Sequence, residues 1–151
     1  MNDTRKHVVV LGGGFAGLSV CRELDDARVR VTLVDRQNHH LFQPLLYQVA
    51  TAGLAAPDIA QPLRHILHDQ ENVTTLMTEV RAIDAAARRV ETTHGVLTYD
   101  YLVIALGART GYFGRNEWEK FAPGLKTLDE ATRLRREMLL AFERAETTND
   151  E

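Results

Sequence analysis

The sequence has 151 residues, of which 44% are hydrophobic and 26% charged, an ordinary composition for one packed domain. Its net charge of -3 gives no overall positive field for nucleic acid, and its lone cysteine, Cys21, excludes an internal disulfide or a redox-active cysteine pair within this chain. No apolar run is long enough to cross a membrane as a helix.

The start of the chain predicts a strand–helix–strand unit. Residues 7–11 form a short β-branched apolar run, typical of a buried parallel strand, and residues 29–34 form a second such strand that ends at Asp35. Residues 15–27 between them predict a helix with a right-handed crossover. The residues expected on one apolar stripe of this helix are Phe15, Leu18, Cys21 and Leu24, with the cysteine as a small buried thiol.

The next segment resists a simple interpretation. Residues 36–55 are punctuated by turn-forming residues yet are rich in apolar side chains, and an apolar loop of this length inside a compact domain is often functional. Residues 57–69 predict a helix. Pro62 should limit or kink that helix, because proline has no N–H to donate.

The next part of the chain predicts strands of two kinds, some in a parallel sheet and some in an antiparallel β-meander. Residues 73–83 predict a strand or a pair of strands, residues 88–93 and 96–99 a β-hairpin, and residues 101–105 another buried strand. The strands at residues 7–11, 29–34 and 73–83 are the first, second and third, and the strand at 101–105 is the fourth. These strands can pair side by side in the order 3-2-1-4. The expected fold class is therefore α/β, a Rossmann-like domain with a central parallel sheet and a small antiparallel β-meander.

The end of the chain predicts one long helix after an irregular stretch over residues 108–126. Thr127 and Glu130 have the spacing of a capping box, which marks the start of the helix. Apolar residues then recur at spacings of three and four, so they share one helix face. They are Ala131, Leu134, Met138, Ala141, Phe142 and Ala145.

The turn after the first strand fits the pattern G-x-G-x-x-G. Gly12 allows a tight turn, Gly14 lets a pyrophosphate approach the backbone, and Gly17 lets the helix pack close to the strand. The N–H groups at the helix start then face the phosphate charge. Asp35 follows 18 positions after Gly17, where a carboxylate can accept both ribose hydroxyls of an adenosine and disfavours a 2′-phosphate. The adjacent Arg36 weakens the argument against a 2′-phosphate.

The glycine pattern does not distinguish FAD from NAD, but the order of the later elements does. An NAD domain would continue with regular βα units, whereas here the loop at 36–55 and a β-meander over about 73–99 precede the last strand. That order favours the FAD domain of glutathione-reductase-like proteins. Their second flavin signature ends in Ala-Thr-Gly; here Ala105 and Gly107 are kept and Leu106 replaces the threonine.

The loop after the second strand is the most specific feature. Residues 38–53, NHHLFQPLLYQVATAG, closely resemble the corresponding segment of type II NADH dehydrogenases, and residues 59–64, IAQPLR, continue the match. With the glycine pattern, Asp35 and the last strand, the resemblance covers nearly the whole chain. The chain is thus similar to the N-terminal, FAD-binding part of an NADH:quinone oxidoreductase of the FAD-dependent pyridine nucleotide-disulfide oxidoreductase superfamily.

This resemblance implies a respiratory-chain flavoprotein that binds FAD non-covalently, takes a hydride from NADH and reduces a quinone without pumping protons. It implies a cytoplasmic location, peripheral to the inner membrane. The glycine turn would cradle the FAD pyrophosphate, Asp35 the adenosine ribose, and the backbone of Val80 the adenine edge. The loop would approach the ribityl chain and isoalloxazine. The residues so expected around FAD are Gly12, Gly14, Phe15, Ala16, Gly17, Asp35, Arg36, Phe42, Pro44, Leu46, Gln48, Val80, Ala105, Leu106 and Gly107.

No catalytic residue and no metal ligand is assigned. His39 and His40 are interpreted as surface or hydrogen-bonded structural residues, because no cysteine or carboxylate stands at a supporting spacing. The flavin would carry the chemistry and the protein would position it.

Members of the resembling family are far longer than this chain. Residues 1–126 are expected to form the FAD-binding portion, and residues 127–151 a connecting helix toward an NADH-binding domain. We therefore expect weakened FAD binding, no NADH oxidation by this chain alone, and self-association through an uncovered sheet edge. The final helix is a second surface for self-association, unless Leu134, Met138 and Phe142 are buried against the chain's own domain.

Three alternatives stay open. A sulfide:quinone oxidoreductase of the same fold would need reactive cysteines, which could lie outside this sequence. A stand-alone, non-catalytic FAD- or nucleotide-binding module would need no NADH motif. A plain NAD-dependent dehydrogenase domain would leave the loop and the β-meander without a role.

Overall fold

The computed structural model describes residues 4–148. Within them the chain forms two compact units: unit 1, of residues 4–40 and 61–107, and unit 2, of residues 41–60 and 108–148. The helix that follows Thr127 packs on a short helix of residues 46–50 in unit 2. The units are described separately.

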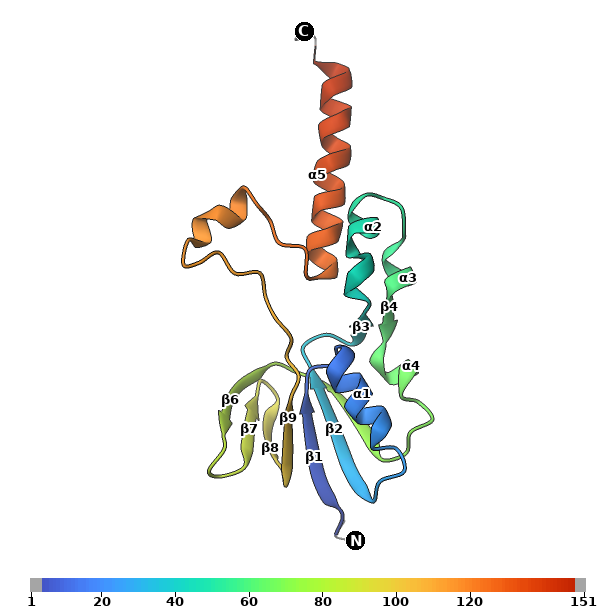
Figure 1. Ribbon diagram of the computed structural model, residues 1–151, viewed down its shortest axis with the longest axis vertical. Helices are drawn as coiled ribbons and strands as arrows, with labels where there is room; N and C mark the ends of the chain where they lie inside the picture. Colours follow the sequence, from blue (N-terminus) through green and yellow to red (C-terminus); the bar gives the residue numbers. More distant parts are fainter. Residues whose placement is uncertain (1–3, 149–151) are drawn as a thin grey trace. The chain divides into compact units, whose positions relative to one another are not determined.

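The centre of unit 1 is a parallel sheet of four strands. They are β1 (Lys6–Leu11), β2 (Val29–Asp35), β5 (Val73–Met77) and β9 (Tyr101–Ile104). Their order is β5-β2-β1-β9, and each neighbouring pair is parallel (Figure 1). The predicted order 3-2-1-4 is confirmed, with the short apolar runs at the centre of the sheet.

Alternate residues of β1 enter two core clusters on opposite faces of the sheet, as the period of two in a strand requires. The cluster on the side of α1 (Phe15–Glu23) contains Val8, Val10, Leu18, Cys21, Val31, Leu33, Leu63 and Leu67. The other cluster contains Val9, Leu11, Val34 and Val90. Burial on both faces explains why β1 reads as a continuous apolar run rather than an alternating one.

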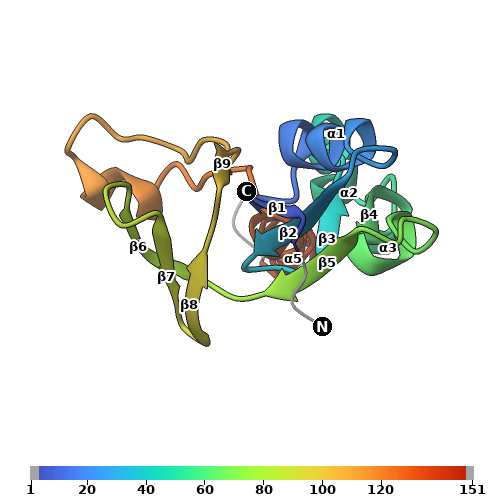
Figure 2. The ribbon, with the colours of Figure 1, turned by 90° about the horizontal axis from the view of Figure 1, so that it is seen from below.

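The second face of the sheet is covered by the predicted β-meander. It consists of β6 (Val80–Asp84), β7 (Arg89–Thr92) and β8 (Gly95–Thr98), which pair antiparallel in that order. Val90 of β7 packs on the sheet, while α1 lies on the opposite side (Figure 2). Residues 73–83 are therefore a pair of strands in two different sheets, with β5 in the first and β6 in the second.

The helix α1 is shorter than expected and ends at Glu23 rather than at residue 27. The side chain of Asn72 donates hydrogen bonds to the carbonyl oxygens of Leu24 (2.7 Å) and Ala27 (3.2 Å), which satisfies these acceptors outside a helix. The expectation that Phe15 shares the buried stripe is wrong, because this first residue of the helix is 49% exposed.

The single helix expected over residues 57–69 is also wrong. The structure has α3 (Ala56–Ile59), the strand β4 (Ala60–Pro62) and α4 (Leu63–Ile66). Pro62 has φ -57° and ψ 128°, an extended conformation, and proline also disfavours helix at the residue before it. The limit that Pro62 imposes was correctly predicted, whereas the intervening strand was not.

The loop that resisted interpretation holds three short elements. They are β3 (His39–Leu41), the 3₁₀ turn η1 (Gln43–Leu45) and α2 (Leu46–Ala50). β3 pairs with β4 in a two-stranded sheet. None of these elements is long enough to display a hydrophobic period of its own.

Unit 2 is built around α5 (Leu128–Thr147), which Thr127 caps as predicted. The stretch before it contains the 3₁₀ helix η2 (Asn116–Lys120). Among the described residues, the core of this unit comprises Leu46, Val49, Ala50, Ile59 and Ala131. Leu134 of the same stripe packs against this core, but beyond it the stripe is open, since Phe142 is 69% exposed and Met138 is exposed too. No helix within residues 4–148 is both long and apolar enough to cross a membrane.

Candidate dinucleotide-binding site

The glycine turn lies at the carboxyl end of β1, where the chain leaves the sheet. The N–H of Gly12 donates to the carbonyl oxygen of Val34 at 2.7 Å, and the N–H of Ala105 donates to that of Leu11 at 2.8 Å. The turn is thus tied to the ends of β2 on one side and β9 on the other. The turn lies at the topological switch point of the sheet, where the chain order of the strands reverses. Open α/β sheets bind their ligands at this point.

Two glycines of the pattern are required by sterics. Gly12 has φ +102°, and a Cβ built there would overlap the backbone of Ala105. A Cβ at Gly17 would overlap the carbonyl of Gly12, so Gly17 allows α1 to pack directly on the turn. Gly14 differs, because a Cβ there would meet nothing within 4 Å. Its bare backbone therefore faces open space at the start of the helix.

The start of α1 is an open helix N-terminus. Gly14 is its N-cap residue and offers no side chain to accept from the first-turn N–H groups. Gly14, Phe15 and Ala16 are exposed, whereas Gly17 and Leu18 are buried. An exposed helix start with its partial positive charge is an anion-binding feature.

Asp35 holds the glycine turn from the end of β2. Its Oδ2 accepts from the N–H of Gly13 at 2.6 Å, and its Oδ1 accepts from the N–H of Gln37 at 2.8 Å. A carboxylate oxygen has more than one lone pair, so each can accept a further hydrogen bond. The half-buried carboxylate can therefore bind ribose hydroxyls while it holds the turn.

His40 meets the same turn from β3. Its Nδ1 lies 3.1 Å from the carbonyl oxygen of Gly13, and its ring packs edge-on against Phe15 with 5.0 Å between centroids. His40 is hydrogen-bonded, as one of the two interpretations held, but its proximity to the glycine turn was missed. The signal available was its place just beyond the end of β2. The Nε2 of its neighbour His39 is buried and has no hydrogen-bond partner among the residues described.

Cys21 is fully buried in the core of unit 1, as expected for a structural thiol. Burial raises its pKa to about 11, because an apolar environment disfavours the thiolate. The cysteine is therefore a poor nucleophile at neutral pH. Within residues 4–148 no group of three or more histidine, cysteine and acidic residues is arranged to hold a metal ion.

Residues 6–144 match the family model described as pyridine nucleotide-disulphide oxidoreductase. The chain belongs to the pyridine nucleotide-disulphide oxidoreductase family. Members of this family are FAD-dependent flavoproteins, in agreement with the order of elements after the glycine turn.

Members of the pyridine nucleotide-disulphide oxidoreductase family resemble this chain along nearly all of its length. NdhA of Mycobacterium tuberculosis, a type II NADH:quinone oxidoreductase, is 47% identical over 150 residues, which are 97% of this chain and 32% of the relative. The structure of NDH2 from Plasmodium falciparum in complex with NADH has a TM-score of 0.87 at 25% identity, covering 97% of this chain and 31% of that one. The resemblance to type II NADH:quinone oxidoreductases is confirmed, and the chain spans about a third of the length of these relatives.

A second similar structure belongs to a protein that is named for a different substrate. The sulfide:quinone oxidoreductase of Aquifex aeolicus has a TM-score of 0.82 at 28% identity, covering 91% of this chain and 32% of that one.

The residues expected around FAD fall in both units. Unit 1 brings together the glycine turn, Asp35 and the strand end at Ala105, with Gly107 at φ +71° in the turn beyond. Arg36 and Leu106 are exposed, and Val80 is half-buried at the start of β6. In unit 2, Phe42 and Pro44 are exposed and Gln48 is half-buried.

Leu46 is buried where its neighbours Phe42 and Pro44 are exposed. Its side chain is 1% exposed and packs with Val49 and Ala131 in the core of unit 2. The side chain of Leu46 therefore stabilises the loop from within.

Proposed function

We propose that this chain forms the FAD-binding part of a flavoprotein that passes electrons from NADH through FAD to a quinone. The observation that carries the dinucleotide part is the hydrogen bond from the Gly13 N–H to Asp35, which fixes the glycine turn and the acidic residue as one site. The 47% identity to a type II NADH:quinone oxidoreductase supports the choice of substrates.

The residues of unit 1 fit the adenosine and pyrophosphate parts of FAD. The open start of α1 at Gly14 and Ala16 suits the pyrophosphate, since exposed N–H groups there have no capping side chain. Asp35 suits the adenosine ribose. The backbone of Val80 is assigned to the adenine edge from the resemblance to type II NADH dehydrogenases. Bound FAD supplies the two-electron chemistry that accepts a hydride from a nicotinamide and delivers electrons to a quinone.

The exposed residues of the loop in unit 2 extend the proposal to the rest of the cofactor. Phe42 and Pro44 are exposed and Gln48 is half-buried. We assign this stretch to the ribityl chain and isoalloxazine from its resemblance to the corresponding segment of type II NADH dehydrogenases. Ala105 and Gly107 would close over the cofactor at the end of β9. In this chain the protein groups bind and orient, and none is assigned a proton-transfer step.

The proposed partners are NADH and a membrane quinone, with the protein peripheral to the membrane that holds the quinone. A second copy of the chain is a further partner, because β9 is an edge strand whose Ile104 is 62% exposed. Light scattering after size exclusion should then report a dimer or larger. Ile104→Lys should shift the protein toward the monomer, and an unchanged mass would reject the sheet edge as the contact.

The second candidate function is that of a sulfide:quinone oxidoreductase. It is supported by the similarity to the Aquifex aeolicus structure. Sulfide oxidation in this reading needs a reactive cysteine. The lone Cys21 is buried with a raised pKa, so the chain contributes none.

The first experiment measures flavin retention. The purified chain is incubated with excess FAD, desalted, and scanned for the visible flavin bands. Retained bands in the wild type and their loss in Asp35→Leu support the dinucleotide site. A folded wild-type chain without any flavin contradicts FAD binding by these residues alone, and NADH should not bleach the bands in this chain.

The second experiment tests the substrates. The chain replaces the matching segment of the Mycobacterium tuberculosis relative, and NADH-dependent quinone reduction by this chimera is assayed. Activity that falls in the Asp35→Leu chimera supports the proposal. A chimera that retains FAD and is reduced by sulfide but not by NADH favours the second candidate.

A further inference from the structure

Gly13 occupies the first of the three unspecified positions in the pattern G-x-G-x-x-G, yet it is held on three sides. Its N–H donates to Oδ2 of Asp35 at 2.6 Å, and its carbonyl oxygen lies 3.1 Å from Nδ1 of His40. A Cβ built at Gly13 would lie 2.5 Å from Cδ1 of Leu63, so a buried leucine closes the third side. Side chains from three other elements therefore meet at this one residue.

The hydrogen bond from His40 has a defined direction. A carbonyl oxygen can only accept, so Nδ1 of His40 carries the hydrogen and donates it to Gly13. The same ring packs edge-on against Phe15, with an interplanar angle of 88°. One side chain thus contacts the residues on both sides of Gly14, the N-cap of α1.

Because the peptide bond between Gly13 and Gly14 is planar, the contact with His40 also affects the N–H of Gly14. In a trans peptide the carbonyl oxygen of one residue and the N–H of the next point in opposite directions within one rigid plane. Because His40 holds the Gly13 carbonyl, it also sets the direction of the Gly14 N–H, which points away from the histidine. Gly14 is exposed, and nothing lies within 4 Å of the position of its absent Cβ.

We propose that His40 is a positioning residue for the dinucleotide pyrophosphate: by binding the Gly13 carbonyl it orients the Gly14 N–H toward the phosphate. This inference rests on the proposed FAD binding. Asp35 fixes the peptide plane before Gly13 and His40 fixes the plane after it, so both planes of the turn are set before a ligand arrives. A backbone that is already oriented loses less entropy when the phosphate binds.

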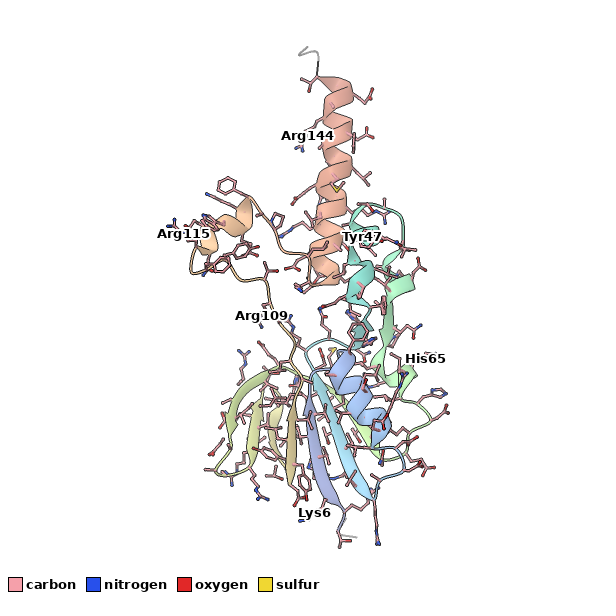
Figure 3. All side chains as sticks on the ribbon, viewed as in Figure 1. Lys6, Tyr47, His65, Arg109, Arg115 and Arg144 are labelled. Atoms are coloured by element: carbon pink, nitrogen blue, oxygen red, sulfur yellow. The ribbon has the colours of Figure 1, made fainter. Side chains whose placement is uncertain are left out.

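The test compares two substitutions of similar size. His40→Asn and His40→Leu both remove the ring, but only asparagine keeps a donor near the position of Nδ1. His65→Asn is the control, because His65 is an exposed histidine of α4 that stacks on His68 (Figure 3). Affinities for FAD and for ADP, which carries the same pyrophosphate, are measured by fluorescence and calorimetry on the full chain.

A second measurement, made on the chain without ligand, tests the orientation of the backbone directly. The order parameter of the Gly14 amide from nitrogen-15 relaxation reports whether this peptide plane is held. We expect His40→Leu to bind both ligands about fivefold more weakly than His40→Asn, the effect of one typical hydrogen bond. The Gly14 order parameter should fall in His40→Leu, remain near the wild-type value in His40→Asn, and be unchanged in His65→Asn.

The outcomes separate the two proposals. Equal affinities and equal Gly14 order parameters in the leucine and asparagine variants overturn the role of His40. A wild-type chain that binds neither FAD nor ADP overturns the proposed function, while the order parameters still decide whether His40 holds the turn. If His40→Leu fails to fold, His40→Phe replaces it, since it keeps a ring against Phe15 and lacks the donor.

Discussion

The main-chain N–H of Gly13 donates a hydrogen bond of 2.6 Å to Oδ2 of Asp35, which stands 22 residues later in the chain. This contact joins the turn after β1 to the end of β2. The same carboxylate that holds the turn has lone pairs left, and in the proposed function these accept from the ribose of the dinucleotide. The site is therefore a single unit of backbone and side chain rather than two separate contacts.

Asp35→Asn should separate the holding of the turn from the proposed binding of the ribose. The asparagine carbonyl can still accept from Gly13, so the fold should be kept, but the charged acceptor for the ribose is lost. Hydrogen bonds to charged groups contribute about 1.5–3 kcal/mol, so FAD affinity should fall about tenfold or more. Fluorescence titration with FAD measures this.

Asp69→Asn is the matched control, because the side chain of Asp69 is 91% exposed and lies outside the glycine turn. Its FAD affinity should equal that of the wild type. An Asp35→Asn variant that binds FAD as tightly as Asp69→Asn would show that the carboxylate charge has no part in binding.

Substitution of two glycines by alanine should change the unfolding free energy by very different amounts. Gly17→Ala places a methyl group against the carbonyl of Gly12, a backbone atom that cannot move aside, and overpacking of this kind costs about 1–3 kcal/mol. Gly14→Ala meets nothing within 4 Å at φ -73°, so its unfolding free energy should change by less than about 1 kcal/mol. Urea unfolding measures both values.

The FAD affinity of the two variants completes this test. Gly14→Ala should weaken FAD binding despite its normal stability, because a methyl group would stand where the phosphate approaches the backbone. Similar stability losses in both variants, or unchanged affinity in Gly14→Ala, would contradict the roles assigned to the two glycines.

Local signals in the sequence were sufficient for much of unit 1. The β-branched run at residues 7–11, the glycine turn and Asp35 each act over a few residues, and they placed β1, the start of α1 and the end of β2 correctly. The capping box of Thr127 and Glu130 is equally local and set the start of α5. Their success follows from the short range of the physics involved.

Contacts between distant residues could not be predicted in this way. His40 reaches Gly13 across 27 residues, and its place just beyond the end of β2 does not by itself specify that partner. The split of residues 57–69 depends on the pairing of β4 with β3, which overrides the local preference for helix. The burial of the Leu46 side chain was missed for the same reason, since it depends on α5 far along the chain.

The thiol of Cys21 should be unreactive in the folded chain. Burial raises its pKa to about 11, so the reactive thiolate is scarce at pH 8, and the side chain is also enclosed. Reaction with a disulfide reagent should be slow in buffer and rapid in concentrated urea. If the folded chain reacts as fast as the unfolded one, the thiol of Cys21 is not buried. That result would support the sulfide:quinone oxidoreductase hypothesis.

The carboxylate of Glu130 should make the stability of α5 depend on pH. Burial alone would raise its pKa, but hydrogen bonds from the N–H groups of Lys126 (2.6 Å) and Thr127 (2.8 Å) outweigh this and hold the pKa below its usual 4.5. A lowered pKa means that the folded chain favours the charged form. The stabilisation is therefore complete above about pH 4.5 and is lost as the pH falls through the lower, folded value.

Glu130→Gln tests this dependence because it keeps the shape of the side chain and removes its charge. Near pH 7 the wild type should unfold at a higher urea concentration than the variant, followed by helix ellipticity, and the gap should narrow as the pH falls below 4.5. Glu146→Gln, at an exposed position near the end of the same helix, should lie close to the wild type throughout. A gap between wild type and Glu130→Gln that stays constant from pH 7 to pH 3 would mean that shape rather than charge caps α5, because a protonated carboxyl and an amide would then serve equally well.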